Sequence, residues 1–331
     1  MESPEGRRAK RLRTAERGIR LHPNAQRELA SRIAGQLRFD EPLAAYTTYR
    51  IGGPASAIVF PSCENDVVES VRFAARNGYR WFALGLGSNI LVSDAGFDGL
   101  VIRFGKGLDP LETEVNGDQA RWRAGAGLPT PLLARRSAKA GLAGVHRLVG
   151  VPGTVGGGVF MNAGAHGQDF GSVVTEVELI GGDGRQRVVT GSEVPWRYRG
   201  SGLEGSLVLS ATLQLDPADP IELEKEVQQH FGWRKAGTPF NEPCCGSVFR
   251  NPPAESLPAD GPRTAGQLID SLGLKGFRVG GAEVSRKHAN YVVNVGAATA
   301  SDVLSVISAV RERVHQEYGL ELVLEVQVVG G

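Results

Sequence analysis

The chain has 331 residues, 41% of them hydrophobic and 22% charged, which predicts a globular protein large enough for two or three domains. No apolar run approaches the roughly 20 residues of a membrane-spanning helix, and the N-terminus lacks a signal-peptide core, so we expect a cytoplasmic protein without a membrane partner. The three cysteines, Cys63, Cys244 and Cys245, have the spacing of neither a disulfide framework nor a metal site, which fits a reducing compartment.

Positive charge is concentrated at the N-terminus, although the formal net charge of the whole chain is only +1. Residues 1–38 carry ten Lys or Arg and four Glu, a net charge of +6, whereas residues 39–331 carry −5. This stretch predicts a disordered extension that either contacts nucleic acid or acidic lipid weakly or is simply solvated. Because no aromatic side chain accompanies the charge, we expect no specific nucleic-acid partner. Within 23–37, apolar residues at every fourth position predict a short helix.

The next elements alternate between strand and helix. Residues 55–60 and 81–87 are apolar runs of the kind that forms buried strands. Residues 64–78 between them predict a helix that ends at Gly78. The apolar face of this helix consists of Val67, Val68, Val71, Ala74 and Ala75. These elements form a β-α-β unit whose second strand leads into a glycine-containing turn.

That turn has the sequence GLGSN and begins like the G-x-G-x-x-G motif of a Rossmann dinucleotide site. Ile90 stands where the third glycine belongs, and strand-like sequence follows in place of a helix, which argues against a Rossmann site. A different phosphate-binding turn stays plausible. Its donors would be backbone N–H groups near Gly85 and Gly87 and the side chains of Ser88 and Asn89.

A second glycine-rich segment lies at residues 150–165. Six of its first fifteen residues are glycine, Gly156 to Gly158 are consecutive, and no residue is charged. Such a segment is either a tight bend between strands or a place where backbone N–H groups approach an anion such as a phosphate. It follows a predicted helix at 129–141 within an otherwise strand-rich region from 99 to 216. Together the two turns would hold the two phosphates of a dinucleotide.

A change in composition near residues 216–220 marks a domain boundary. After it, helices are predicted at 221–237, 263–276 and 301–319. We expect the last of them to have Ser301 as its N-cap and to bury one face. That face consists of Val303, Leu304, Ile307, Val310 and Val314.

The residues 320–329 alternate between apolar and other side chains, which predicts a final strand. Its apolar face consists of Leu320, Leu322, Leu324, Val326 and Val328. Glu325 points away from that face. It is either solvated, as glutamates on strands usually are, or available for chemistry.

Eight motifs, taken in chain order, resemble those of the UDP-N-acetylenolpyruvoylglucosamine reductase (MurB) family. They are TTYRIGG (47–53), GLGSNILV (85–92), GVPGTVGG (150–157), NAGA (162–165), YRGS (198–201), GSVFRNP (246–252), the stretch 265–294 and LEVQVVG (324–330). They cover nearly everything from about residue 43 onward, in the family's order and with similar spacing. No tyrosine-bearing insert is evident, so the chain is similar to the shorter class of that family.

The resemblance implies an α+β fold, with a two-subdomain FAD-binding unit of the PCMH/vanillyl-alcohol-oxidase type followed by an α+β substrate-binding domain. Residues 1–38 would be the basic, disordered extension. Residues 39–105 and 106–216 would be the two FAD-binding subdomains, and 217–331 the C-terminal domain. The last strand is a candidate to return to the FAD-binding unit.

The resemblance also implies NADPH-dependent reduction of UDP-N-acetylglucosamine enolpyruvate to UDP-N-acetylmuramate through bound FAD, a step of peptidoglycan precursor synthesis. The residues that match FAD-binding motifs are Arg50, Ile51, Gly52, Gly53, Gly85, Leu86, Gly87, Ser88, Asn89, Ile90, Gly150, Val151, Pro152, Gly153, Thr154, Gly156, Gly157, Asn162, Ala163 and Gly164. The residues matched to substrate binding are Asn251, Lys275, Gly281 and His288. The expected partner is a small UDP-sugar, no metal is implied, and a monomer is expected.

Three matched residues would carry the chemistry. Ser247 corresponds to the serine that protonates the substrate, and Arg199 and Glu325 correspond to the pair that stabilises its developing negative charge. Hydride addition to the β carbon of an enolpyruvyl ether places negative charge on the α carbon and the carboxylate. A guanidinium fork, a protonated carboxyl and a positioned hydroxyl are the groups that this reaction needs.

Taken one at a time, these residues have simpler interpretations. Ser247 follows a glycine, as an ordinary turn residue would, and Arg199 lies among other arginines, as on a surface. Lys275 either pairs with the substrate diphosphate or ends a helix near its negative end. His288 is either structural or close to the substrate, because no partner has metal-site spacing.

Two other classes of function stay open. A related flavin oxidoreductase acting on another substrate would share the FAD-binding motifs, although the C-terminal motifs argue against it. A non-catalytic flavin or nucleotide binder would be favoured if Ser247, Arg199 or Glu325 were replaced, and all three are present.

Overall fold

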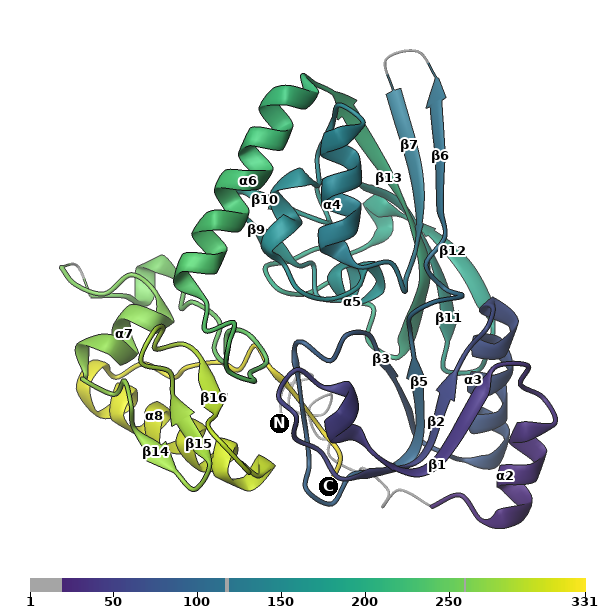
Figure 1. Ribbon diagram of the computed structural model, residues 1–331, viewed down its shortest axis with the longest axis horizontal. Helices are drawn as coiled ribbons and strands as arrows, with labels where there is room; N and C mark the ends of the chain where they lie inside the picture. Colours follow the sequence, from purple (N-terminus) through teal and green to yellow (C-terminus); the bar gives the residue numbers. More distant parts are fainter. Residues whose placement is uncertain (1–19, 117–118, 259) are drawn as a thin grey trace, which may run out of the picture.

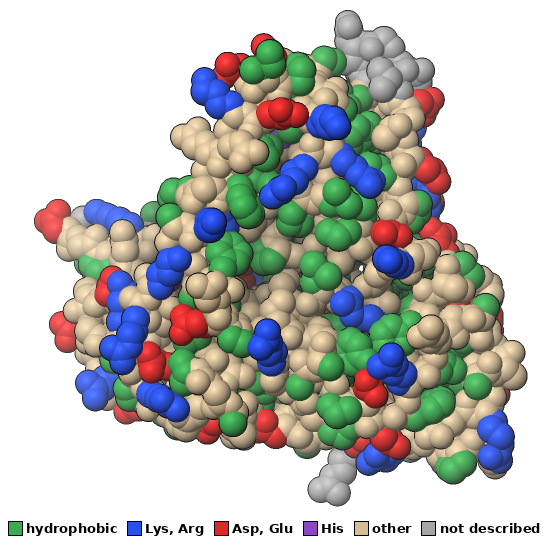
Figure 2. Space-filling view, in the orientation of Figure 1, with side chains coloured by type: hydrophobic (Ala, Val, Ile, Leu, Met, Phe, Trp, Pro, Cys, Tyr) green, Lys and Arg blue, Asp and Glu red, His purple; other side chains and the backbone are tan. Residues whose placement is uncertain are grey.

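The computed structural model describes residues 20–116, 119–258 and 260–331. Figure 1 shows two sheet-containing subdomains side by side and a smaller α+β domain beside them, with the long helix α6 running towards it. On the face shown in Figure 2, acidic and basic side chains are interspersed over all three parts. Within the described ranges, no helix has both the length and the apolar character that crossing a membrane requires.

The first subdomain is a four-stranded sheet with the order β1-β2-β5-β3. β1 is antiparallel to β2, and the other neighbours are parallel. β2, α3 and β3 form the predicted β-α-β unit, with β5 inserted between its two strands. The elements are α2 (Pro23–Ala30), β1 (Gln36–Pro42), η1 (Leu43–Tyr46), β2 (Pro54–Phe60), α3 (Glu64–Asn77), β3 (Trp81–Leu84), β4 (Ile90–Val92) and β5 (Phe97–Arg103).

Helix α3 confirms the predicted helix and shows which residues form its buried face. Val67 and Ala74 are fully buried, at the i and i+7 positions of one helix face. Phe73 is buried in place of Ala75, which is exposed, so this part of the predicted face was wrong. The helix ends at Gly78, whose φ of +69° is in the left-handed region.

Folded structure begins well before residue 38. The part of the predicted extension that the structure describes, residues 20–38, contains α2 and the start of β1, so the expectation of disorder does not hold for it. Its buried apolar side chains join the first sheet, and they are Leu21, Ala25, Leu29 and Ile33. α2 is shorter than predicted, because Leu37 belongs to β1. The expectation for residues 1–19 concerns residues outside the described part of the chain.

The second subdomain is built around one long strand, β13. It is the middle strand of the order β12-β11-β13-β7-β6, with antiparallel neighbours, and β8 also pairs with it. Its run Leu207–Leu213 is buried in the largest hydrophobic cluster, which includes side chains from α3 and α4. The elements are β6 (Leu111–Asn116), β7 (Gln119–Gly125), α4 (Thr130–Lys139), β8 (Leu142–Ala143), β11 (Val174–Gly181), β12 (Gln186–Thr190), η3 (Gly191–Glu193), β13 (Ser206–Pro217) and α6 (Pro220–Gly237).

Helix α6 packs on helix α4 of the second subdomain. Leu223 and Val227 pack with Ala134 and Ala138 of α4. The boundary that we predicted at residue 217 therefore assigns to the C-terminal domain a helix that packs on the second subdomain.

Residues 150–165 contain a short helix where we predicted a loop. α5 (Val155–Phe160) follows the turn η2 (His146–Gly150), and the hairpin of β9 (Gly164–Ala165) and β10 (Gln168–Asp169) comes next. An added Cβ at Gly156 would lie 2.7 Å from the Cβ of Ala126, and one at Gly158 would lie 2.3 Å from Cε2 of Phe170. These two glycines are therefore required by packing, whereas the Cβ position of Gly157 is open.

The C-terminal domain packs two helices on a small antiparallel sheet. Its elements are η4 (Ala254–Ser256), α7 (Ala265–Ser271), β14 (Arg278–Val279), β15 (Ala282–Val284), β16 (Val292–Asn294) and α8 (Ala300–Tyr318). The predicted cap of α8 was wrong, because the N-cap is Thr299 and Ser301 lies in the first turn. Leu304 is 39% exposed and Val306 is buried instead, which corrects the predicted buried face.

Side chains of the first subdomain, among them Tyr49 and Asp94, attach the C-terminal domain to it. Tyr49 is fully buried in the hydrophobic cluster of the C-terminal domain. Asp94 accepts hydrogen bonds from the backbone N of Ala300 at 2.7 Å and of Ser301 at 3.0 Å. A carboxylate of one domain therefore caps helix α8 of the other.

The predicted final strand is mostly irregular. β17 (Gln327–Val329) is short and pairs in parallel with β4 of the first subdomain, so the chain does return there. Leu322 and Val326 are buried as predicted. Val328 is 45% exposed, because the chain leaves the C-terminal core after Val326 to join β4.

Candidate active site

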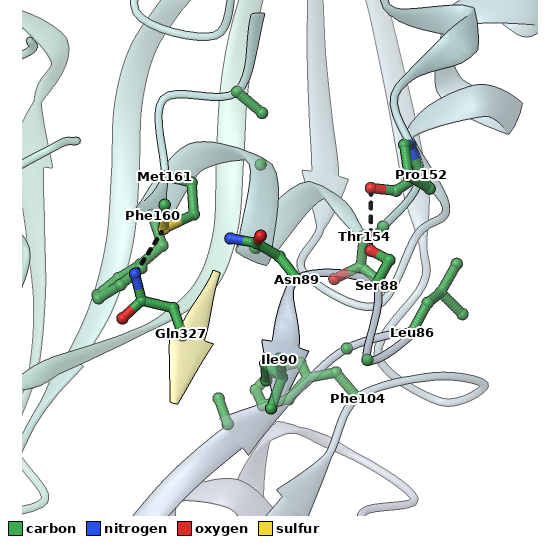
Figure 3. Close-up of a pocket in the computed structure, with 18 of the residues that line it drawn as sticks. Leu86, Ser88, Asn89, Ile90, Phe104, Pro152, Thr154, Phe160, Met161 and Gln327 are labelled. Atoms are coloured by element: carbon green, nitrogen blue, oxygen red, sulfur yellow. Dashed lines mark hydrogen bonds between the residues drawn. The ribbon is translucent and has the colours of Figure 1, made fainter. Parts of the chain in front are cut away.

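A cavity of about 830 Å³ lies where the three parts of the fold meet. Its walls come from the turn between β3 and β4, from the segment around α5, and from residues near 246 and 325. Figure 3 shows Asn89 from the first segment, Met161 from the second and Gln327 of β17 around the same space. A cavity of this size accommodates a dinucleotide-sized ligand.

The turn between β3 and β4 is anchored on two sides. The backbone N of Thr48 donates to the carbonyl of Gly87 at 3.1 Å. The Oγ of Ser88 donates to the carbonyl of Pro152 at 3.1 Å, which joins the two glycine-rich segments (Figure 3). Gly87 has a φ of +65°, and a Cβ there would lie 2.4 Å from the carbonyl oxygen of Tyr46. Glycine is therefore required at this turn.

The residues present fit the diphosphate group of FAD. The two glycine-rich segments carry no Asp or Glu, and Gly153 and Gly157 line the cavity. An added Cβ would meet no atom closer than 3.3 Å at Gly153 and 3.9 Å at Gly157, so the backbone there is open to a ligand. Backbone and small polar groups without carboxylates suit a bound anion. Apolar rings line other parts of the cavity, namely Tyr79, Trp81, Phe82, Phe97, Phe104 and Phe160.

Arg199 and Glu325 form an ion pair inside the cavity. The Nε of Arg199 donates to Oε1 of Glu325 at 2.8 Å, and the two side chains are 23% and 18% exposed. Burial raises the pKa of Glu325, while Arg199, Arg250 and Arg234 oppose that shift. Since burial prevails, this carboxyl keeps its proton to a higher pH than an exposed glutamate does.

The backbone holds both members of the pair in place. Arg199 has a φ of +56°, a left-handed conformation that is uncommon outside glycine and is concentrated at functional sites. The N of Glu325 donates to the carbonyl of Val248 at 2.8 Å. The Nδ2 of Asn89 donates to the carbonyl of Glu325 at 3.1 Å. Glu325 is therefore held by the first subdomain and by the C-terminal domain together.

Ser247 lies on the same cavity wall. It is half-buried, lines the cavity and directly precedes Val248, which holds the backbone of Glu325. Gly246 before it has a φ of +82°, so the chain turns there in a way that glycine favours. The structure therefore brings Ser247, Arg199 and Glu325 into one cavity, although they are far apart in the sequence.

Of the two cysteines beside Ser247, Cys245 packs in the core of the C-terminal domain and Cys244 is half-buried. Cys245 is 1% exposed, and burial raises the pKa of its thiol and that of Cys244, so neither is poised as a thiolate. Over the described part of the chain, no group of three His, Cys, Asp or Glu side chains is arranged to hold a metal ion.

Most residues predicted to bind FAD line the cavity, and five do not. Arg50–Gly53 is an irregular segment in which Ile51 packs into the core of the C-terminal domain. Asn162 is buried, accepts a hydrogen bond from the N of Gly171 and donates to the carbonyl of Arg197. For these five residues contact with the cofactor stays a prediction.

The four residues predicted to bind substrate lie outside the cavity lining and have partners within the protein. Asn251 accepts a hydrogen bond from the first turn of α7, and Lys275 pairs with Asp270 at 2.6 Å. Gly281 donates to a carboxylate in the first turn of α8. His288 accepts a hydrogen bond from a nearby backbone N–H, and burial lowers its pKa. Their contact with substrate also stays a prediction.

Sequence reasoning missed several polar or aromatic residues of the cavity wall, among them His166, Trp233 and Arg234. His166 directly follows the NAGA motif, which was an available signal. Trp233 and Arg234 lie near the end of α6, whose pattern was used only to predict a helix.

Comparison with known proteins supplies the family. A family model described as "UDP-N-acetylenolpyruvoylglucosamine reductase, C-terminal domain" matches residues 238–329, and one described as "FAD binding domain" matches 55–190. The chain is 41% identical over 298 residues to the UDP-N-acetylenolpyruvoylglucosamine reductase of Halalkalibacterium halodurans, covering 89% of this chain and 95% of that protein.

This chain belongs to the UDP-N-acetylenolpyruvoylglucosamine reductase family. Its identity to the Bacillus subtilis reductase is 38% over 307 residues, which cover 92% of this chain and 97% of that one. The crystal structure of the reductase (MurB) from Thermus caldophilus matches with a TM-score of 0.71 and 34% identity, covering 89% of this chain and 99% of that chain.

Membership of the reductase family confirms the predicted α+β fold class, with an FAD-binding unit followed by the C-terminal domain of the family. It confirms FAD as the cofactor and identifies the chain as an FAD-containing oxidoreductase. The roles of single residues depend on the geometry of the cavity.

Proposed function

We propose that this reductase-family protein reduces UDP-N-acetylglucosamine enolpyruvate to UDP-N-acetylmuramate with NADPH, through FAD, in peptidoglycan precursor synthesis. The observation that carries the proposal is the half-buried pair of Arg199 and Glu325, joined at 2.8 Å in the cavity that Ser247 lines. The named relatives are reductases of an enolpyruvyl sugar nucleotide, and the cavity holds the groups that such a reaction needs.

The reaction creates a carbanion that the protein must stabilise and protonate. Bound FAD would supply the hydride chemistry, taking a hydride from NADPH and giving it to the β carbon of the enolpyruvyl ether. The guanidinium of Arg199 is permanently charged and matches a carboxylate in shape. Glu325, whose pKa is raised by burial, would donate a hydrogen bond from its protonated carboxyl to the same oxygens. The hydroxyl of Ser247 would deliver the proton to the α carbon.

The glycine-rich segments would hold the cofactor beside these groups. Gly85–Ile90, Gly150–Thr154, Gly156 and Gly157 line the cavity and would bind the diphosphate through backbone N–H groups. Asn89 belongs to the first of these segments and donates to the carbonyl of Glu325 at 3.1 Å. The segment that binds the cofactor therefore also positions the carboxyl.

We further propose a cytoplasmic monomer with a small UDP-sugar as its partner. All three parts of the fold contribute to the cavity wall, and Ser247, Arg199 and Glu325, the groups that the proposed reaction needs, come from this one chain. A sugar nucleotide and NADPH are both charged, water-soluble molecules, which suits an enzyme in the cytoplasm.

A flavin titration tests the proposal. The purified protein should show a flavin spectrum that NADPH bleaches without oxygen and that recovers when UDP-N-acetylglucosamine enolpyruvate is added. Recovery with oxygen alone would point to an oxidase with the same fold. Absence of bound flavin, or bleaching without recovery by that substrate, would refute the proposed reaction.

A further inference from the structure

Three rings are packed together where α6 meets the cavity. The ring centroid of His166 lies 4.0 Å from that of His230 at an interplanar angle of 27°, and 5.1 Å from that of Trp233 at 82°. His166 and Trp233 line the cavity, yet Trp233 is 64% exposed. A large aromatic side chain that is this exposed at a cavity wall offers a surface on which a ligand can stack.

The backbone positions His166 for this contact. His166 and Gly167 form the two-residue turn between β9 and β10, with φ of +53° and +78°, the left-handed pair that suits a tight hairpin. Asn or Asp would serve that turn equally well. The turn therefore does not require an imidazole at this position. The ring of His166 instead makes the contacts with the rings of His230 and Trp233.

His230, on which the ring of His166 stacks, is itself positioned by a carboxylate of α6. The carboxylate of Glu226, one helical turn earlier on α6, lies 3.9 Å from Nε2 of His230. The same carboxylate pairs with His146 at 3.1 Å and Arg147 at 2.8 Å. Burial lowers the pKa of His166, and the nearby His230, Arg147 and Arg234 lower it further, so its ring is neutral near pH 7.

Arg234 follows Trp233 and supplies positive charge at the same wall. The Nε atom of Arg234 is buried without a hydrogen-bond partner. Among the residues that the structure describes, no carboxylate forms an ion pair with Arg234. The guanidinium carbon lies 5.8 Å from the ring centroid of Tyr291. Arg234 as a whole is half-buried, but a buried N–H without an acceptor is costly unless a ligand such as an anion satisfies it.

We propose that Trp233 and Arg234 form a nucleotide subsite, in which the indole stacks on a heteroaromatic base and the guanidinium contacts the diphosphate. His166 and His230 brace the indole. The inference rests on the proposed function, in which two nucleotides of this kind, the sugar nucleotide and NADPH, enter the cavity beside FAD. Base and diphosphate are common to both, and separate titrations distinguish them.

Calorimetric titration of the FAD-loaded protein with UDP, and separately with NADP⁺, tests the subsite. Trp233→Ala should raise the Kd of the nucleotide that binds there about tenfold, since stacking of a base on an aromatic ring is lost. Trp233→Phe should restore most of the affinity. His166→Asn, which keeps the hairpin turn, should cause a smaller loss in the same direction.

Two further variants separate stacking from charge. Arg234→Gln should weaken the same nucleotide about tenfold and make the remaining binding less dependent on salt. Phe240→Ala is the matched control, because Phe240 is an aromatic residue of 56% exposure outside the cavity lining, and it should change neither Kd.

A higher Kd for UDP alone would assign the subsite to the sugar nucleotide, and a higher Kd for NADP⁺ alone would assign it to the reductant. Unchanged values for both ligands in Trp233→Ala and His166→Asn, with normal FAD content, would overturn the proposal. So would loss of FAD without a change in nucleotide affinity. These titrations measure binding and need no turnover. The proposal of the subsite and the proposal of the reaction can therefore be refuted separately.

Discussion

The Nε atom of Arg199 lies 2.8 Å from the Oε1 atom of Glu325, although the two residues are 126 positions apart in the chain. Arg199 belongs to the second subdomain, between β12 and β13, and Glu325 lies just before β17. The pair therefore exists only when these two parts of the fold are correctly docked. Changes at either residue should affect the substrate half-reaction and spare the reduction of FAD.

Arg199→Lys keeps the charge but loses the planar fork. Reduction by NADPH should proceed at the normal rate, while reoxidation by the enolpyruvyl substrate should slow about 10²–10³-fold, the usual cost of one preorganised donor. Anaerobic stopped-flow absorbance measures both steps. Arg197→Lys is a matched control, because Arg197 pairs with Glu204 on the surface. An equal loss in the control would contradict the role of Arg199.

Because of Glu325, the pH–rate profile of the substrate half-reaction should have an alkaline limb, that is, a fall in rate at high pH. Burial raises the pKa of Glu325, so its protonated, hydrogen-bond-donating form persists to higher pH than in an ordinary glutamate and is lost as pH rises through that pKa. Single-turnover reoxidation of the wild type should therefore fall at high pH. Glu325→Gln, whose amide donates at every pH, should be slower but free of this limb. A profile of the same shape in both proteins would rule out this assignment.

Ser247→Ala should still be bleached by NADPH and should reoxidise about 10²–10⁴-fold more slowly, because the general acid is lost. The same anaerobic mixing experiment measures it. Ser271→Ala is a control on the C-terminal domain, since the hydroxyl of Ser271 bonds to Leu268 and Tyr318 away from the cavity. Wild-type reoxidation in Ser247→Ala would remove Ser247 from the acid role.

Neighbouring glycines of α5 should respond oppositely to the same substitution. Gly158→Ala places a Cβ 2.3 Å from the buried ring of Phe170 and should lower the free energy of unfolding by about 1–3 kcal/mol. Gly157→Ala has no atom within 3.9 Å and should leave stability unchanged or raise it by up to about 1 kcal/mol. Its methyl group would enter the cavity, so FAD affinity should fall. Urea unfolding and flavin content measure the two effects, and destabilisation in both variants would show that α5 is packed differently.

Asp94→Asn should weaken the attachment of α8 in a pH-dependent way. Burial raises the pKa of Asp94, but hydrogen bonds from Ala300 and Ser301 outweigh it, so the net pKa is below the ordinary 3.8. A lowered carboxyl pKa stabilises the fold above the unfolded pKa, and this stability is lost as pH falls through the folded pKa. The variant should lose about 1 kcal/mol at pH 7, and the difference should shrink in acid. Asp98→Asn, an exposed aspartate of β5, is the control.

Local elements of the fold were predictable where short-range physics decides them. The valines of α3 at helical spacing, and Gly78 at its end, determine that helix almost alone. Gly156 and Gly158 were misread as loop glycines because their reason lies in Ala126 and Phe170, which contact them only in the folded protein.

The site was predictable in part for the same reason. Ser247, Arg199 and Glu325 were found through motifs, and the cavity brings them together. Trp233 and Arg234 carry no local signal, because α6 faces a cavity wall that other segments complete.

The pairing of β17 with β4 also bears on how the protein is made. Asn89 and Glu325, which that pairing brings together, are 236 residues apart. A chain emerging from the ribosome can fold most of its first subdomain early, yet the pairing of β4 and the placement of Glu325 wait until residues 325–329 have been synthesised. If Glu325 acts as we propose, chains that end before residue 325 should be unable to carry out the substrate half-reaction, whatever flavin they have already bound.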